Sequence, residues 1–356
     1  MAAQNARIQY RKKSASSSST AYYSGSLSEA GTYSVTLDGV LEASTEYEFR
    51  AAIDVYVNGA YTTIYGDWVS FSTTAASSDV PSGWLELPAI TGNEDYVGTL
   101  YTTGVAAVSG DEADRNYSFN YSYENFGALW VAYPLRSSDI SGSASTSTWN
   151  YYPTSYIPQR YQVDMTGKSY PTMYNASSYT KGHQIPNADR KFSSVANSQT
   201  YYVTNQTPQI GDKFNGSIWS SLETAVRNLT QNTDVVYVVT GAAYKTVGGN
   251  ETVKTLKAAS SSTNPQEVPV PNYYWKAILK VKTSSSGAIT SASAIGFWFE
   301  HKEYDSGADY TTCACSVDYI EQKTGFDLFT NLPGDNSSGI EKTAEANTSW
   351  TTFQSF

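Results

Sequence analysis

The sequence contains few cysteines and histidines, the residues that stabilise small folds through disulfide bonds or zinc sites. It contains only two cysteines and two histidines in 356 residues. Cys313 and Cys315 are two positions apart, and a bridge between them would close a small, strained ring, so two free thiols are expected. A zinc site built from these cysteines with His183 and His301 has poor ligand spacing. His301 is expected at a strand end facing solvent, and zinc chemistry is disfavoured.

Positive charge and long apolar runs are also scarce. Lys and Arg number 23 against 33 Asp and Glu, for a net charge of −10, which by itself argues against a nucleic-acid partner because phosphate binding rests on basic surface. Basic residues nonetheless outnumber acidic ones between Met165 and Thr230, so the centre of the chain is locally basic. No apolar run is long enough to span a bilayer.

The abundant residue is tyrosine, with 30 copies. Together with frequent Ser and Thr, it is typical of a secreted or cell-surface protein rich in strands and exposed loops. No signal peptide is visible at Met1, as expected if a secretion signal has been removed.

Residues 1–75 alternate polar and apolar positions between turn residues, which predicts a β-sandwich. Its strands are predicted at 7–11, 32–37, 47–55 and 67–72. The stretch from Leu41 to Arg50 resembles the corner and following strand of fibronectin type III domains, and the resemblance implies that Tyr47 is a tyrosine corner. Residues 76–83 are small and polar with Pro and Gly, which indicates a linker.

Residues 84–356 predict a separate α+β domain around a central mixed or antiparallel sheet. Helices are expected at 216–228 and at 317–324, the second with Ser316 as its N-cap and Gly325 at its end. The run 234–241 is almost wholly apolar and predicts a strand buried on both faces. Further strands are expected at 117–122, 128–133, 274–281 and 293–299.

Two stretches carry candidate chemistry. His183 has the side chain best suited to take a proton near neutral pH, although a lone histidine is more often structural. Asn215, Glu223 and Arg227 are separated by eight and four residues, which rotate about 80° and 40° around an α-helix. An amide, a carboxylate and a guanidinium on one helix side fit a hard cation and a phosphate. An ordinary solvated face with a Glu–Arg pair is the alternative.

The segments 181–190, 205–209 and 215–227 together resemble the sugar-non-specific DNA/RNA endonucleases of the ββα-metal superfamily. The resemblance spans most of 84–356. It is supported by four further motifs, at 130–133, 239–241, 271–276 and 317–325. It implies a ββα-metal nuclease domain that binds Mg²⁺, with Mn²⁺ as a substitute, and hydrolyses DNA and RNA to 5′-phosphate and 3′-hydroxyl ends.

The resemblance also implies roles for single residues. His183 matches the general base and Asn215 the only protein ligand of the metal. Glu223 matches the residue that holds metal-bound water, Arg227 a phosphate-binding arginine, and Asn205 a residue that shapes the site. Substrate contacts are expected from Lys181, Arg190 and Arg227.

The chain departs from the family motif just before His183. Thr180 stands where the family has Asp, so the carboxylate is lost. Lys181 stands where the family has Arg, so the positive charge is kept but the two parallel donors of a guanidinium are lost. The family's upstream arginine is also missing, and Arg136, Arg160 or Arg190 is expected to replace it. Two rival functions stay open: a degenerate nuclease that binds nucleic acid or another surface polymer without cutting it, and an adhesion protein whose β domain binds glycans or proteins.

Asn205 and Asn215 both begin N-glycosylation sequons inside the candidate site. A glycan there would block the site, which favours a bacterial origin. The sequence does not set the oligomeric state.

Overall fold

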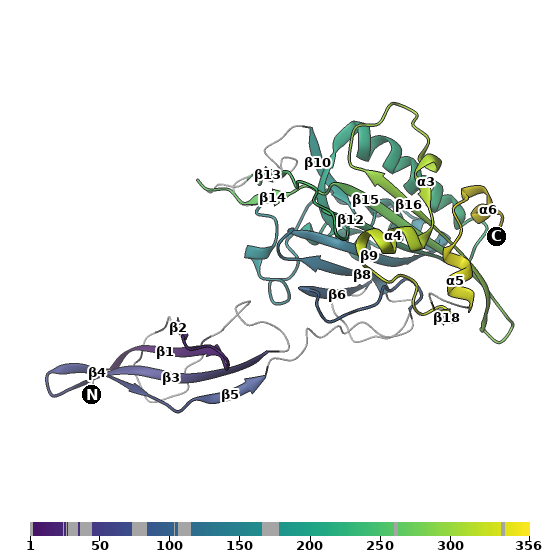
Figure 1. Ribbon diagram of the computed structural model, residues 1–356. Coiled ribbons are helices and arrows are strands. Elements are labelled where there is room, and N and C mark those ends of the chain that lie inside the picture. Colours follow the sequence, from purple (N-terminus) through teal and green to yellow (C-terminus); the bar gives the residue numbers. More distant parts are fainter. Residues whose placement is uncertain are drawn as a thin grey trace. The chain divides into compact units, whose positions relative to one another are not determined.

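The chain folds into two compact units, Met1–Ser77 and Ser78–Phe356, both drawn in Figure 1. The predicted linker at 76–83 lies outside the described residues and stays a prediction. The structure, a computed structural model, describes residues 3–23, 25, 27, 35, 45–72, 84–102, 104–105, 115–165, 178–259, 263–335 and 339–356.

The described part of the first unit is one antiparallel sheet, ordered β2-β1-β3-β4 with β5 also beside β3. Three of its strands fall where the alternation predicts them. The hairpin between β3 and β4 turns at Asn58 and Gly59, which have φ of 52° and 87°, as a two-residue turn requires. The strands are β1 (Ala3–Lys12), β2 (Ser19–Tyr22), β3 (Glu46–Val57), β4 (Ala60–Tyr65) and β5 (Val69–Ser72).

The predicted two-sheet sandwich is not seen among the described residues of this unit. The predicted strand at 32–37 falls on residues that are not described, apart from Val35. Tyr47 is buried and stacks on Phe71, with ring centroids 5.8 Å apart, so it is a core residue of the sheet. The fibronectin type III resemblance therefore stays a prediction.

The second unit is built on an eight-stranded antiparallel sheet with the order β17-β16-β15-β12-β9-β8-β6-β7. Its strands are β6 (Tyr96–Tyr101), β7 (Gly104–Val105), β8 (Arg115–Ser122), β9 (Gly127–Leu135), β12 (Val236–Ala243), β15 (Tyr273–Thr283), β16 (Ile289–Glu300) and β17 (Ala314–Cys315). The outlying strands are β10 (Tyr179–His183) with β11 (Gln206–Ile210), β13 (Thr255–Lys257) with β14 (Glu267–Pro269), and β18 (Gly334–Asp335).

Short helices connect and cover these strands. The α-helices are α1 (Ser137–Ile140), α2 (Ser194–Gln199), α3 (Ser220–Leu229), α4 (Val317–Thr324), α5 (Gly339–Glu345) and α6 (Trp350–Ser355). A π-helix, η5 (Gly211–Trp219), precedes α3, and single 3₁₀ turns are η2 (Gln159–Tyr161), η3 (Asn187–Asp189), η4 (Val203–Asn205) and η6 (Tyr310–Cys313).

The central sheet is covered on both faces because its inner strands are apolar on both sides (Figure 1). Every residue of β12 is buried. Val236 and Val238 pack into the core that holds η5, α3 and α6, while Tyr237 and Val239 pack into the core that holds α4 and α5. Each such side chain stabilises the fold by about 1.5–3 kcal/mol through burial. The predicted strand at 234–241, buried on both faces, is confirmed.

Two predicted helices have different outcomes. The helix at 317–324 is confirmed as α4, since the Ser316 hydroxyl accepts a hydrogen bond from the Tyr319 N–H at 3.1 Å and Gly325 has φ of 77°. The helix predicted at 216–228 begins earlier, at Gly211, and its first nine residues are π-helical. Its backbone bonds there reach five residues back instead of four, as Ser220 N–H does to the Asn215 carbonyl.

No helix in the described ranges is long and apolar enough to cross a membrane. Cys313 and Cys315 are both free thiols, as expected.

Candidate active site

His183 ends β10, where it pairs with Gln206 of β11. Asn205 is fully buried and fastens the chain just after the histidine. Its Oδ1 accepts from the Ile185 N–H at 3.0 Å, and its Nδ2 donates to the carbonyls of Ile185 at 3.0 Å and Thr200 at 2.8 Å. Asn205 therefore fixes the backbone just after His183, and its role is to position the histidine.

Aromatic rings flank the His183 imidazole. Its ring centroid lies 4.7 Å from that of Trp149 and 4.8 Å from that of Tyr201. Nε2 is buried and has no hydrogen-bond partner within the described ranges. Burial, and then the positive charge of Lys181, lower the pKa of His183 to about 3. The imidazole is thus neutral at pH 7 and can accept a proton.

Gly182 and Gln209 connect the histidine to the predicted metal ligand. A Cβ on Gly182 would lie 2.1 Å from Cδ of Gln209, so only glycine leaves room for that side chain. Gln209 is fully buried, and its Oε1 accepts a hydrogen bond from Nδ2 of Asn215. The bond orients the Asn215 amide and leaves Oδ1 as the atom that can bind a cation.

Glu223 lies on α3 in an electrostatic pair with Lys276 of β15. Lys276 is 1 % exposed, and its Nζ sits 4.9 Å from the centroid of the Trp219 ring with no hydrogen-bond partner among described residues. Burial raises the pKa of Glu223, and the charge of Lys276 acts in the opposite direction. Burial likewise lowers the pKa of Lys276, against the pull of Glu223. Sequence reasoning assigned Lys276 no role, although a lysine inside an apolar strand was the signal.

Arg227 lies close enough to Glu223 for its charge to lower the pKa of that carboxyl. Its Nη1 pairs with Oδ1 of Asp189 at 3.0 Å, and Nη2 donates to Oγ1 of Thr224 at 3.0 Å. Asp189 is itself buried and accepts from the Tyr133 hydroxyl at 2.9 Å. Arg227 keeps 19 % of its side chain exposed, so part of the guanidinium faces solvent.

The prediction that Arg190 contacts substrate is wrong. The residue is 2 % exposed. Its Nε donates to Oδ1 of Asn116 at 2.6 Å, Nη1 to the Asp189 carbonyl at 2.8 Å, and Nη2 to the Asn116 and Pro134 carbonyls at 2.7 and 2.9 Å. These bonds commit the donors to the protein and tie the segment after His183 to β8 and β9.

The expectation that His301 faces solvent is also wrong. The Ile210 N–H donates to its Nε2 at 2.9 Å, so the ring proton is on Nδ1, which donates to the Pro271 carbonyl at 2.8 Å. Burial lowers the pKa of His301 to about 4. This histidine pins the end of β11 to the central sheet. Neither histidine nor either cysteine joins the one group of potential metal ligands found among the described residues.

A cavity of about 650 Å³ lies elsewhere on the second unit, between the ends of β9 and β12 and the β13–β14 hairpin. None of the predicted site residues lines it. This cavity is therefore not the site that the sequence predicts.

Comparison with known proteins decides the family. Residues 97–335 match the family model described as DNA/RNA non-specific endonuclease. The chain belongs to this family. Every predicted site residue lies within the matched range, whereas the first unit lies outside it.

The relatives are named nucleases. The chain is 31% identical over 189 residues to the mitochondrial Nuclease 1 of Schizosaccharomyces pombe, covering 52% of this chain and 55% of that protein. It is 29% identical over 229 residues to a Nostoc nuclease, covering 64% and 76%. It spans between 51% and 66% of the length of the first three curated relatives. A chain of the crystal structure of the EndoG/EndoGI complex aligns with a TM-score of 0.48 at 22% identity, covering 61% of this chain and 84% of that one.

Nucleases of this family are metal-dependent enzymes that act on nucleic acids, and the nuclease domain offers suitable ligands. Asn215 presents an amide oxygen that the Gln209 bond has already oriented. Glu223 contributes a carboxylate on the helix that continues η5. Oxygen ligands of this kind suit a hard divalent cation.

Proposed function

We propose that the second unit is a Mg²⁺-dependent endonuclease of the ββα-metal type, with Mn²⁺ as a substitute ion. It hydrolyses phosphodiester bonds of DNA and RNA to 5′-phosphate and 3′-hydroxyl ends. The observation that carries the proposal is the connection from Gly182 through Gln209 to Asn215. It links the strand that carries His183 to an oriented amide oxygen through β10, β11 and η5.

In the proposed reaction His183 takes a proton from a water molecule. The water oxygen bonds to phosphorus as the bond from phosphorus to the 3′ oxygen breaks, and the 3′ oxygen leaves to take up a proton from solvent. The depressed pKa keeps His183 in the accepting form over the physiological range. The rings of Trp149 and Tyr201 hold the imidazole plane in place.

Asn215 would bind the metal through Oδ1, and Glu223 would hold its waters, as the family resemblance implies. When bound, the metal supplies positive charge that stabilises the transition state. Arg227 would contact phosphate with the donors that face solvent. Lys181, which follows Thr180 on β10, would supply a second cation. Its pKa is lowered to about 8 by burial, so it is mostly charged at pH 7.

The test is cleavage of plasmid DNA and total RNA with Mg²⁺ or with EDTA, beside the His183→Ala and Asn215→Ala variants. We expect metal-dependent cleavage that falls by about 10²–10⁴-fold without the general base and is also lost without Asn215. Asn228→Ala, an exposed asparagine on α3, is the matched control and should cleave normally. Cleavage that persists in EDTA, or in both site variants, would overturn the proposal. Binding without cleavage by the folded protein would favour a degenerate nuclease.

We further propose that the protein is bacterial and is secreted or held at the cell surface. The composition supports this, and so does Asn205: its sequon is buried and its amide is bonded on both sides, so a glycan has no room there. Detecting the protein only inside its native cells would contradict the proposal.

A further inference from the structure

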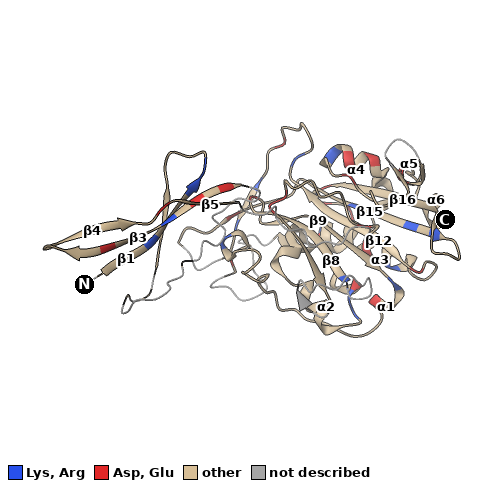
Figure 2. Ribbon diagram, turned by 90° about the horizontal axis from the view of Figure 1, so that it is seen from below, with Lys and Arg blue, Asp and Glu red and all other residues tan. Residues whose placement is uncertain are grey.

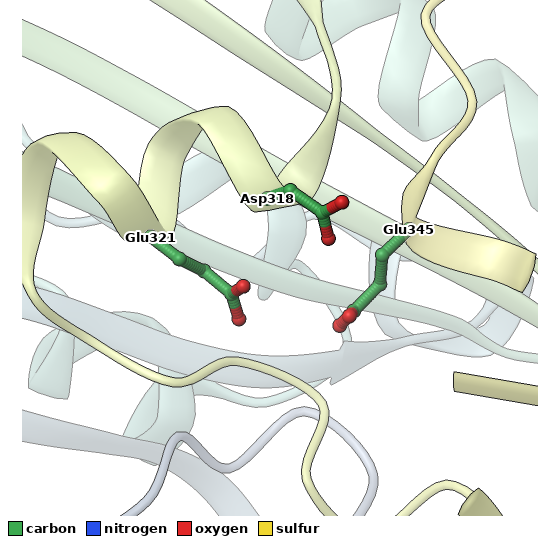
Figure 3. Close-up of side chains that lie close together, drawn as sticks. All are labelled: Asp318, Glu321 and Glu345. Carbon is green, nitrogen blue, oxygen red and sulfur yellow. The ribbon is translucent and has the colours of Figure 1, made fainter. Parts of the chain in front are cut away.

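Three carboxylates converge between α4 and α5, in the core opposite the one that packs against α3. Asp318 and Glu321 come from α4, and Glu345 is the last residue of α5. Ligand oxygens of the three lie within 4.8 Å of one another, and Figure 3 shows the side chains pointing toward a common centre. Figure 2 shows the acidic residues of α4 in red.

Glu345 is the unusual member of this acidic cluster. It is fully buried, and neither carboxylate oxygen has a hydrogen-bond partner within the described ranges. Burying a carboxylate without a partner is costly, and two further acids, Glu341 and Asp327, add negative charge around it. A side chain in this position needs either a proton or a positive partner.

The protein's own groups only partly compensate this charge. Lys342 donates to Oδ2 of Asp318 at 2.9 Å, but the lysine side chain is 43 % exposed and lies at the rim. The Leu328 N–H donates to Oε1 of Glu321 at 2.7 Å. Both hydrogen bonds are made to residues of α4, and neither is made to Glu345.

We propose that Asp318, Glu321 and Glu345 bind a divalent cation of the size of calcium, which fastens α5 to α4. An all-oxygen set of carboxylates from two helices suits Ca²⁺, which accepts six to eight oxygen ligands in flexible geometry. Soft metals prefer sulfur and nitrogen ligands, which this cluster does not offer. The site is separate from the candidate nuclease site, because α4 and α5 pack in a different core cluster from η5 and α3.

Protons compete with the cation for these carboxylates. Burial, reinforced by the neighbouring acids, raises the pKa of Glu345 to about 9.

The test uses the full-length Asn215→Ala variant, so that cation binding at the candidate nuclease site does not contribute to the measured signal. After EDTA treatment and dialysis, CaCl₂ is titrated while binding heat and Tm are followed. We expect one binding event, and a Tm raised by about 5–10 °C at a calcium concentration about 100 times Kd. MgCl₂ should bind more weakly.

Adding Glu345→Gln should abolish the calcium response, while the Tm without calcium stays about equal because the amide has nearly the shape of a protonated carboxyl. Glu303→Gln, which changes an exposed acid paired with Lys213, should leave the response intact. A calcium response that survives Glu345→Gln, or no response in the parent, would overturn the proposal. The second result would mean that the cluster holds only protons.

Discussion

At the residue scale, the active site depends on a position with no side chain. Gly182 is adjacent to the proposed base, and the space beside it is filled by Gln209, which in turn orients Asn215. A substitution at Gly182 should therefore displace both His183, its neighbour in the chain, and Asn215. The family motif contains this glycine next to the histidine, and the packing supplies a physical reason for it.

We predict that Gly182→Ala lowers stability by about 1–3 kcal/mol through overpacking and cleavage by about 10²-fold through displacement of Asn215. Tm and initial rates on plasmid DNA measure the two effects. Gly66→Ala, where a Cβ has room, is the control. In Gly182→Ala with Gln209→Ala the stability should return and the activity should not. Recovery of both would show that Gln209 does not position Asn215.

Lys276 adds a second residue-scale expectation. Its positive charge lowers the pKa of Glu223, so Lys276→Met should raise that pKa further. At pH 7 more Glu223 is then protonated and unable to hold metal-bound water. We predict reduced kcat/KM at pH 7 that recovers as the pH rises, and a near-normal profile for Lys276→Arg. A pH profile of Lys276→Met that matches the parent would contradict this role.

At the scale of elements, the paired strands β10 and β11 involve both histidines in different ways. His183 is the proposed base, and His301 anchors the end of β11 at Ile210 and Pro271. The chain has only these two histidines, so both imidazole signals can be assigned with a single variant.

We predict that both imidazoles stay neutral at pH 5.5 in the folded protein, because burial lowers their pKa to about 3 and about 4. Nitrogen NMR shifts across pH 4–8 measure this, and His183→Ala assigns the signals. The unfolded chain binds these protons near pH 6.5, so the two groups contribute stability above that pH. The contribution is lost as the pH falls toward about 4. A titration centred near pH 6.5 would refute the prediction.

The elements also show what the sequence can predict. The strands around β12 and the helix α4 are set by local patterns, namely an apolar run and a pair of caps, and these are confirmed. The Asn58-Gly59 hairpin was missed although its dipeptide is a strong local signal. The π-helical start of the α3 segment has no such local pattern in the sequence.

Arg190 shows the same limit for a site residue. Arg190 follows Pro186 and Asn187 closely in the chain and stands beside Asp189. This sequence context is compatible with an exposed arginine that binds substrate. Its actual partners, the carbonyls of Asn116 and Pro134, lie 74 and 56 residues away in the chain. Only the packing of β8 and β9 in three dimensions reveals that the guanidinium is hydrogen-bonded within the protein.

At the scale of the whole molecule, the centre of the chain is less basic at its surface than its composition suggests. Arg190 is buried and Lys213 is paired with Glu303 at 2.6 Å. Figure 2 shows Lys and Arg spread over both units. Under the proposed function, the metal ion, Lys181 and Arg227 are the groups expected to attract phosphate.

The two units also differ in what they contribute to stability. The three clusters of buried apolar residues described in the molecule draw on residues 84–353. We therefore predict that residues 78–356 alone fold with an unchanged Tm and cleave nucleic acid as the full chain does. Calorimetry and plasmid cleavage, compared with the full chain at equal concentration, provide the test. Loss of folding or of cleavage in the shorter chain would assign the first unit a structural role.

The π-helix η5 makes the segment before α3 tolerant of one length change. Because its backbone bonds skip one more residue than in an α-helix, removing one residue, such as Ser217, would let the segment relax into an α-helix continuous with α3. A π-turn holds about one residue more than an α-turn, so the deletion would be absorbed and Asn215 would keep nearly the same side of the helix relative to α3. A one-residue gap between Asn215 and Trp219 in an alignment would thus mark a relative with an ordinary α-helix there that still presents its amide to the same side.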